Sequence, residues 1–220
     1  MDLAPYIEQT LLKPEATVQE IASLCREARR YNFVAVCVNP VYVESASQYL
    51  RGSGLCVCAV VGFPLGAATA AVKAFEAGEA VADGAREIDM VIHIGSLKAG
   101  KLDHLEAEIA AVVQAARGCP VKVILETGLL TDAEKIAGCQ AAKKGGARFV
   151  KTSTGFGPGG ATAADIRLLK KAAGTGMGVK ASGGVRTREI ALEMIAAGAS
   201  RIGTSSGAAL MEGCRPGPAD

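Results

Sequence analysis

The 220-residue sequence has no tryptophan and only two histidines, His93 and His104. Neither histidine has another histidine or a cysteine at ligand spacing, and the seven cysteines form no CxxC pair. The sequence therefore gives no indication of a zinc site. We expect neither a metal nor a cofactor, and we interpret most cysteines as reduced core residues.

The sequence also lacks any apolar run near the ~18 residues that a membrane-spanning helix needs. Its N-terminus, MDLAPYIEQT, has neither the basic nor the apolar region of a signal peptide. The net charge is only +2, and basic residues are interleaved with acidic ones. We therefore expect a soluble, cytoplasmic protein that binds small molecules, and no nucleic-acid or membrane partner.

What the sequence does have is a regular alternation of two patterns. Runs rich in valine and isoleucine occupy 34–38, 55–62, 87–95, 121–127, 148–153, 178–182 and 201–205, with a weaker candidate at 6–10. Alanine-rich segments with helical periodicity occupy 18–30, 70–84, 105–118, 132–146, 163–174 and 188–198. Apolar strands separated by amphipathic helices are typical of a parallel sheet covered by helices.

This alternation predicts an α/β fold, a single-domain (β/α)8 TIM barrel over residues 1–213, followed by a flexible tail over 214–220. Thr17 is a candidate N-cap of the first helix. Glycines just before several strands, as in VADGAR, KGGAR and AAGAS, are typical of helix C-termini.

Active sites of such barrels lie at the carboxyl ends of the strands. The polar residues expected there are Glu8, Thr10, Cys37, Asn39, Asp89, His93, Glu126, Thr127, Lys151, Thr152, Ser153, Lys180 and Ser182. Burial and a second ammonium nearby both disfavour the charged form of a lysine, so one of Lys151 and Lys180 can be a neutral nucleophile. Alternatively, each lysine extends to solvent or pairs with a carboxylate.

Asp89 is flanked by apolar residues, where a carboxylate is costly unless it is paired. It can pair with a lysine and relay protons, or it can form a purely structural ion pair. Glu126 can orient a lysine. We interpret His93, Cys37 and the cysteines at 56 and 58 as packing residues rather than catalysts.

Glycine turns follow the last two predicted strands. SGGVRT follows Lys180, and GTSSG precedes a short helical stretch, AALMEG. Barrels often bind phosphate with these two loops, through backbone N–H groups and a helix N-terminus. Together with Arg186, Ser205 and Ser206, the turns predict an anion site.

The ordered motifs IEQTLLKP, VCVNP, VGFPLG, EIDMVIHIG, KVILETGLL, FVKTSTGFGPGGAT, GVKASGGVRT and ASRIGTSSG cover nearly the whole chain. Together they resemble the deoxyribose-phosphate aldolase family. The resemblance implies a metal-free class I aldolase that reversibly cleaves 2-deoxy-D-ribose 5-phosphate to D-glyceraldehyde 3-phosphate and acetaldehyde. Two positions depart from the family pattern: Glu8 replaces an aspartate in a D-H-T string, and His93 replaces an asparagine.

The resemblance implies that Lys151 is the Schiff-base nucleophile, that the charge of Lys180 disfavours protonation of Lys151, and that Asp89 relays protons. It further implies substrate-binding positions at Thr10, Cys37 and Thr152, and phosphate-binding positions at Gly155, Gly183, Gly184, Gly203, Ser205 and Ser206. We also expect sugar-phosphate and aldehyde ligands and a homo-oligomer, either a dimer or a tetramer. Two other interpretations stay open: a phosphate-binding isomerase, and a non-catalytic barrel that senses a sugar phosphate.

Overall fold

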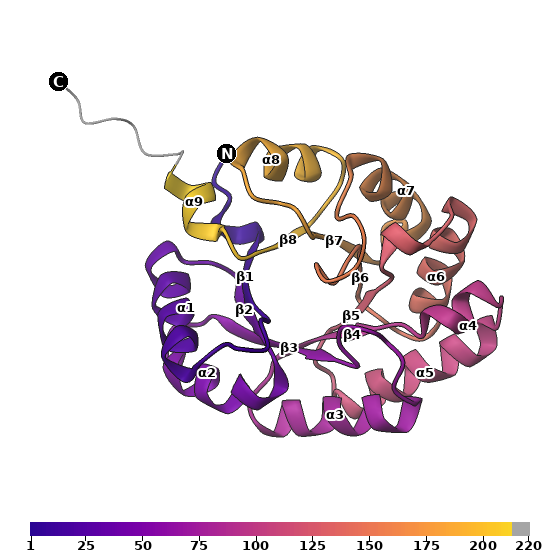
Figure 1. Cartoon of the computed structure of the whole chain (residues 1–220), viewed down its shortest axis with the longest axis horizontal. Helices are drawn as coiled ribbons and strands as arrows, with labels where there is room; N and C mark the ends of the chain where they lie inside the picture. Colours follow the sequence, from indigo (N-terminus) through magenta and orange to yellow (C-terminus); the bar gives the residue numbers. More distant parts are fainter. Residues whose placement is uncertain (213–220) are drawn as a thin grey trace.

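A closed barrel of eight parallel strands, ordered as in the sequence, forms the centre of the computed structural model (Figure 1). The structure describes residues 1–212, so the predicted domain end at 213 and the predicted tail over 214–220 lie outside the described residues. The strands are β1 (Ile7–Leu11), β2 (Ala35–Val38), β3 (Cys56–Val61), β4 (Glu87–Val91), β5 (Val121–Ile124), β6 (Phe149–Lys151), β7 (Gly178–Ser182) and β8 (Arg201–Thr204). The predicted (β/α)8 fold is confirmed.

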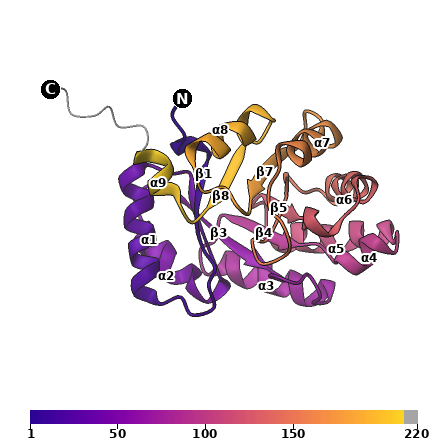
Figure 2. The ribbon, with the colours of Figure 1, turned by 45° about the horizontal axis from the view of Figure 1, so that its top comes forward.

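Helices surround the barrel and connect consecutive strands (Figures 1 and 2). They are α1 (Val18–Tyr31), α2 (Val43–Tyr49), α3 (Ala70–Ala82), α4 (Ile94–Lys98), α5 (Leu102–Ala115), α6 (Asp132–Lys144), α7 (Ala163–Ala173), α8 (Arg188–Ala196) and α9 (Gly207–Glu212). Single 3-10 turns occupy η1 (Ala4–Tyr6), η2 (Pro40–Tyr42) and η3 (Thr127–Leu129). Within residues 1–212, no helix is long and apolar enough to cross a membrane.

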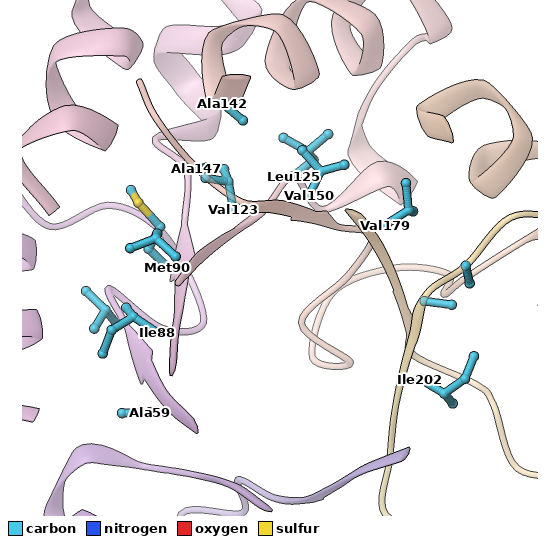
Figure 3. Packing of buried hydrophobic residues seen from close by; sticks show 14 of the residues in the cluster. Ala59, Ile88, Met90, Val123, Leu125, Ala142, Ala147, Val150, Val179 and Ile202 are labelled. Carbon is cyan, nitrogen blue, oxygen red and sulfur yellow. The ribbon is translucent and has the colours of Figure 1, made fainter. Parts of the chain in front are cut away.

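The outward faces of the strands form the main hydrophobic core. Figure 3 shows Ile88 and Met90 of β4, Val150 of β6, Val179 of β7 and Ile202 of β8 in this cluster of buried residues. Successive residues of a strand point to opposite faces, so the residues between these apolar side chains point into the barrel. The outward positions thus anchor the helices and leave the inward positions free to carry polar groups.

The inward faces are much more polar than the outward ones. Contacts inside the barrel join Glu8, Cys37, Cys58, Glu87, Asp89, Lys122, Lys151, Lys180 and Arg201, which come from all eight strands. A buried charge is tolerated only when another charge or hydrogen-bond partner compensates it. The barrel interior is therefore built for electrostatics rather than for packing alone.

Local sequence signals set the helix ends. Thr17 caps α1 in a capping box with Glu20, which confirms the predicted cap. Gly84, Gly146 and Gly198 follow α3, α6 and α8 with φ of 109°, 87° and 114°. In this left-handed region glycine avoids the clash that a Cβ would cause, so these turns return the chain to the next strand.

The fourth strand is shorter than the run over 87–95 suggested. It ends at Val91, because His93 caps α4 by accepting a hydrogen bond from the Ser96 N–H at 3.0 Å. The helices α2 and α4 were not predicted, since they are only 7 and 5 residues long and too short to show helical periodicity.

Candidate active site

Lys151 and Lys180 face the barrel interior side by side. They are register partners on the adjacent parallel strands β6 and β7, so their side chains leave the sheet on the same face. Their side chains are only 2% and 0% exposed. The interpretation in which each lysine extends to solvent is therefore wrong, and the two amines share one desolvated space.

Asp89 of β4 lies between these amines. Its Oδ2 accepts hydrogen bonds from Lys151 Nζ and Lys180 Nζ, each at 2.8 Å. Lys122 Nζ approaches Oδ1 at 3.0 Å. Burial by itself would raise the pKa of Asp89, but the three ammonium groups outweigh burial and hold it well below its usual range. Asp89 is thus a stable carboxylate that connects the two lysines through one oxygen.

The charge of Lys180 is held by two carboxylates. Its ammonium donates to Asp89 and to Glu8, which stands at the first position that departs from the family pattern. Burial would lower the pKa of Lys180, but Asp89 and Glu8 outweigh burial and raise it. The longer side chain of Glu8 therefore still reaches Lys180, which keeps its positive charge.

Lys122 of β5 is a buried lysine that was not predicted as a site residue. Its ammonium lies 2.5 Å from Glu87 and 3.5 Å from Glu8, in addition to its contact with Asp89. Burial would lower the pKa of Lys122, but Asp89 and the other anionic neighbours hold it well above its usual range. Strand alternation could have revealed it: Lys122 lies two residues before Ile124, the register partner of Lys151.

Two thiols complete the inner surface. Cys58 Sγ lies 3.1 Å from Asp89 Oδ1, and Cys37 Sγ lies 4.0 Å from Asp89 Oδ2. Burial raises the pKa of Cys58 well above its usual value, so this thiol stays protonated and donates to the carboxylate. Cys58 thus contacts the site directly, in addition to the packing role expected for it.

Two groups of side chains within residues 1–212 have ligand atoms close enough to hold a metal ion: Cys37, Cys58 and Asp89, and Glu8, Cys58 and Glu87. Every carboxylate in these groups already contacts a lysine ammonium group. A cation would have to compete with those ammonium groups for the same oxygens, so this arrangement favours ion pairs.

A cavity of about 210 Å³ opens at the carboxyl ends of β1, β6, β7 and β8. It is lined by Thr10, Leu11, Leu12, Lys13, Lys151, Thr154, Gly155, Phe156, Ser182, Gly183, Gly184, Val185, Arg186, Gly203, Thr204 and Ser205. These described lining residues include three cationic side chains and no acidic one. The cavity is therefore suited to an anionic ligand that reaches the amine of Lys151.

The glycine loops form one side of this cavity. Gly183 and Gly184 have φ of 86° and 81°, a conformation that few other residues adopt. The backbone N–H groups of Gly184 and Ser205 have no hydrogen-bond acceptor within residues 1–212. Unpaired N–H groups at a cavity wall are the donors that phosphate-binding loops provide.

Gly203 has a second role that the sequence did not suggest. A Cβ at this position would lie 2.8 Å from Lys180 Cε and 3.1 Å from Ser182 Cβ. The first distance is shorter than real Cβ contacts, so the absence of a side chain at Gly203 leaves room for Lys180.

Three of the expected ligand-binding residues do not line the cavity. Thr152 is fully buried, and its hydroxyl donates to Ser182 O at 2.9 Å and accepts from Ser182 N at 3.1 Å, which ties β6 to β7. Cys37 lies deeper, beside Asp89. Ser206 accepts the N–H of Leu210 and so starts α9.

Glu126 and His93 have structural roles at neighbouring strand ends. Glu126 adopts a φ of 59° and accepts hydrogen bonds from the backbone N–H and hydroxyl of Thr154. It therefore holds the cavity loop after β6 rather than a lysine. His93 points to Ser96 and lies near His104, with ring centroids 6.3 Å apart.

Comparison with known proteins agrees with this geometry. Residues 4–212 match the DeoC/LacD family aldolase model. The chain is similar to the deoxyribose-phosphate aldolases of Streptococcus sanguinis, 56% identical with 97% of each chain covered, and of Lysinibacillus sphaericus, 57% identical with 96% of each covered. The solved tetrameric deoxyribose phosphate aldolase of Aeropyrum pernix has a TM-score of 0.90 and 38% identity, over 96% of this chain and 90% of that one. The resemblance seen in the motifs is thus confirmed: the chain belongs to the DeoC/LacD family of aldolases and is an enzyme.

Proposed function

We propose that this enzyme is a class I aldolase that reversibly cleaves 2-deoxy-D-ribose 5-phosphate to D-glyceraldehyde 3-phosphate and acetaldehyde through a Schiff base on Lys151. The observation that carries the proposal is the position of Lys151. Its amine lines the cavity and contacts Asp89 Oδ2, whereas Lys122 and Lys180 are absent from the described lining residues. The names of the relatives support deoxyribose phosphate as the substrate.

The first step is attack by the neutral amine of Lys151 on C1 of the open-chain sugar. The amine is formed in a desolvated space beside Lys180, which keeps its charge and so disfavours a second ammonium. The carbinolamine loses water and becomes an iminium ion. This cation is the electron sink for the next step.

Cleavage then breaks the bond between C2 and C3. The proton of the C3 hydroxyl leaves, the C3–O bond becomes a carbonyl, and the bonding pair moves to C2 to form an enamine as the iminium is neutralised. Glyceraldehyde 3-phosphate departs. Protonation of the enamine at C2 and hydrolysis of the resulting iminium ion release acetaldehyde and the lysine amine.

Asp89 and Lys180 provide the path for these protons. One oxygen of Asp89 contacts both lysine amines at 2.8 Å, so a proton can pass between Lys180 and the reacting centre through that oxygen or a bound water. Because the pKa of Asp89 is low and that of Lys180 is raised, the pair rests as carboxylate and ammonium. Asp89 is then the group that can accept the C3 hydroxyl proton, directly or through a bound water, and Lys180 is the group that can donate a proton to the enamine carbon.

The other end of the cavity anchors the phosphate. The N–H groups of Gly184 and Ser205 supply donors, and Lys13 and Arg186 add two positive charges at the wall. Thr10 also lines the cavity, and we assign it a contact with the sugar. This anchoring places C1 at the amine, which is how binding energy remote from the reaction contributes to rate.

The test is a cleavage assay on deoxyribose 5-phosphate, with both acetaldehyde and glyceraldehyde 3-phosphate measured. The expected result is equal amounts of the two products, and a much lower kcat/KM for unphosphorylated deoxyribose. Lys151→Met is expected to abolish product formation. Turnover of the phosphorylated sugar to an isomer, without acetaldehyde, would support the isomerase interpretation instead, and tight binding without turnover would support the sensor.

We further propose that the enzyme acts in the cytoplasm as a homo-oligomer. The six cysteines within the described residues are all free, as is usual in a reducing compartment. Leu65, Val72 and Phe75, around the start of α3, are 75%, 54% and 70% exposed. Exposed apolar clusters often mark contact surfaces. Light scattering is expected to give a mass above that of one chain, and Phe75→Ser is expected to lower it.

A further inference from the structure

Within the described residues 1–212, seven charged side chains inside the barrel form one connected set of contacts, which we call the barrel charge network. Its members are Glu8, Glu87, Asp89, Lys122, Lys151, Lys180 and Arg201. Apart from Arg201, which is 18% exposed, no member is more than 7% exposed. When every group is ionised, three carboxylates face four cations, so the network holds one positive charge in excess where water screens poorly.

The cations toward the amino-terminal end of the strands are well compensated. Lys122 Nζ lies 2.5 Å from Glu87 and 3.0 Å from Asp89. It also lies 3.5 Å from Glu8. Arg201 lies 3.4 Å from Glu87 and 3.6 Å from Glu8. Each of these two cations thus contacts two or more carboxylates.

Lys151 is the least compensated cation of the network. Within residues 1–212 its only carboxylate contact is Asp89 Oδ2 at 2.8 Å, and it shares this oxygen with Lys180. Lys180 has a further carboxylate, Glu8. If one cation must lose its proton to balance the network, the smallest electrostatic loss is at Lys151.

Within residues 1–212, three thiols are the other titratable groups that face the network: Cys37 from β2, and Cys56 and Cys58 from β3. The charged members come from the other strands: Glu8 from β1, Glu87 and Asp89 from β4, and one cation each from β5, β6, β7 and β8. All eight strands are thereby accounted for. The substitutions tested below leave all three thiols in place.

We propose that Lys122 and Glu87 are positioning residues that set, through the net charge of the barrel charge network, the fraction of Lys151 that is neutral and able to attack a carbonyl. This inference rests on the proposed function, in which Lys151 is the nucleophile. Neither residue belongs to the described lining of the cavity, so neither acts by touching substrate. Each side chain influences Lys151 through its charge, and removing the two charges is expected to change the neutral fraction of Lys151 in opposite directions.

The test compares Lys122→Met with Glu87→Gln. In each variant, Lys151 is trapped with acetaldehyde and borohydride at a series of pH values, and the modified peptide is quantified by mass spectrometry. Lys122→Met leaves three carboxylates with three cations. Lys151 then keeps its proton, and the pH midpoint of trapping moves up by about one to two pH units. Glu87→Gln leaves two carboxylates with four cations, so the midpoint moves down.

Lys122→Arg and Glu87→Asp are the charge-preserving controls and are expected to keep the wild-type midpoint. Opposite shifts in the two charge-removing variants support the inference, because a merely structural role would move both in the same direction. Shifts of the same sign, or an unchanged midpoint in a folded variant, would overturn it. If Lys122→Met does not fold, Glu87→Gln alone tests the inference: a downward shift of its trapping midpoint supports the inference, and no shift or an upward shift overturns it. A wild-type chain that forms no adduct would instead overturn the proposed function, and this inference with it.

Discussion

Replacing Lys180 by methionine removes an ammonium group from between two buried carboxylates while keeping a side chain of similar length. In this variant Asp89 still has ion pairs with Lys151 at 2.8 Å and with Lys122 at 3.0 Å, and Glu8 still has an ion pair with Lys122 at 3.5 Å. Removing one partner of a buried ion pair costs about 3 to 5 kcal/mol when the other charge is left alone. Because neither carboxylate is left alone here, we expect a loss near the lower end, about 3 kcal/mol.

The effect on rate is expected to be larger than this loss of stability suggests. In the proposed mechanism, Lys180 is both the charge that disfavours a proton on Lys151 and the proton donor, and a positioned acid or base contributes about 10² to 10⁴ in rate. Urea unfolding followed by circular dichroism gives the free energy of unfolding, and acetaldehyde release gives kcat. We expect a folded Lys180→Met protein with kcat reduced at least about 100-fold.

Lys73→Met is the matched control. Lys73 is another fully buried lysine, on α3, and it pairs with Glu108 at 2.6 Å outside the barrel interior. Because Glu108 has no other cationic partner within residues 1–212, removal of Lys73 is expected to lower stability at least as much as removal of Lys180, while kcat stays within a few-fold of wild type. The reasoning is refuted if folded Lys180→Met retains the wild-type kcat. It is also refuted if folded Lys73→Met loses as much of its kcat, since the loss would then reflect a general loosening of the structure.

Two further predictions concern the space and the charges around the same lysine. Gly203→Ala places a Cβ 2.8 Å from Lys180 Cε, so we expect the ammonium to shift and kcat to fall about tenfold or more, at a stability cost of about 1 to 3 kcal/mol. The control is Gly176→Ala, where nothing lies within 4 Å of the added Cβ, and it is expected to keep the wild-type kcat. A Gly203→Ala protein with wild-type kcat would argue against the close fit. Burial would raise the pKa values of Asp89 and Glu8, but nearby lysine ammonium groups lower them. Their contribution to stability is therefore complete above about pH 5 and is lost as the pH falls through the folded-state pKa values, so the Tm of wild type should drop on acidification below about pH 5, and more than in a Glu8→Gln variant.

The barrel itself could be predicted because its two periodicities are strong. Strands such as β2 and β7 are short apolar runs, and helices such as α1 follow a clear N-cap. The end of β4 could not be placed, because the apolar residues after Val91 suit a strand as well as a helix. That choice depends on the His93 cap, a local hydrogen bond that hydrophobic periodicity does not reveal.

Within the site, Lys151, Lys180 and Asp89 could be predicted because each is a charge in an apolar strand. Lys122 obeys the same rule, yet it lies near the start of β5 rather than at its carboxyl end, where active-site residues of barrels are sought. It also contacts Glu8 on β1, which is not adjacent to β5 in the barrel, and strand order alone does not specify such a contact across the interior.

The loops show a different limit of prediction from sequence. Glycine turns after β7 and β8 indicated an anion site, and Gly183, Gly184 and Ser205 do line the cavity. The sequence could not show that Gly203 faces Lys180 or that Ser206 begins α9, because hydroxyl and glycine positions serve turns, caps and ligands alike.

The most direct test of the central claim is to find where a carbonyl substrate becomes covalently attached. The chain is incubated with acetaldehyde, reduced with borohydride and digested, and the peptides are mapped by mass spectrometry. Our account predicts the added mass of one ethyl group on the peptide that contains Lys151, and no such peptide in the Lys151→Met protein. An unmodified Lys151 in a protein that still cleaves deoxyribose 5-phosphate, or an adduct on Lys122 or Lys180 instead, would contradict it.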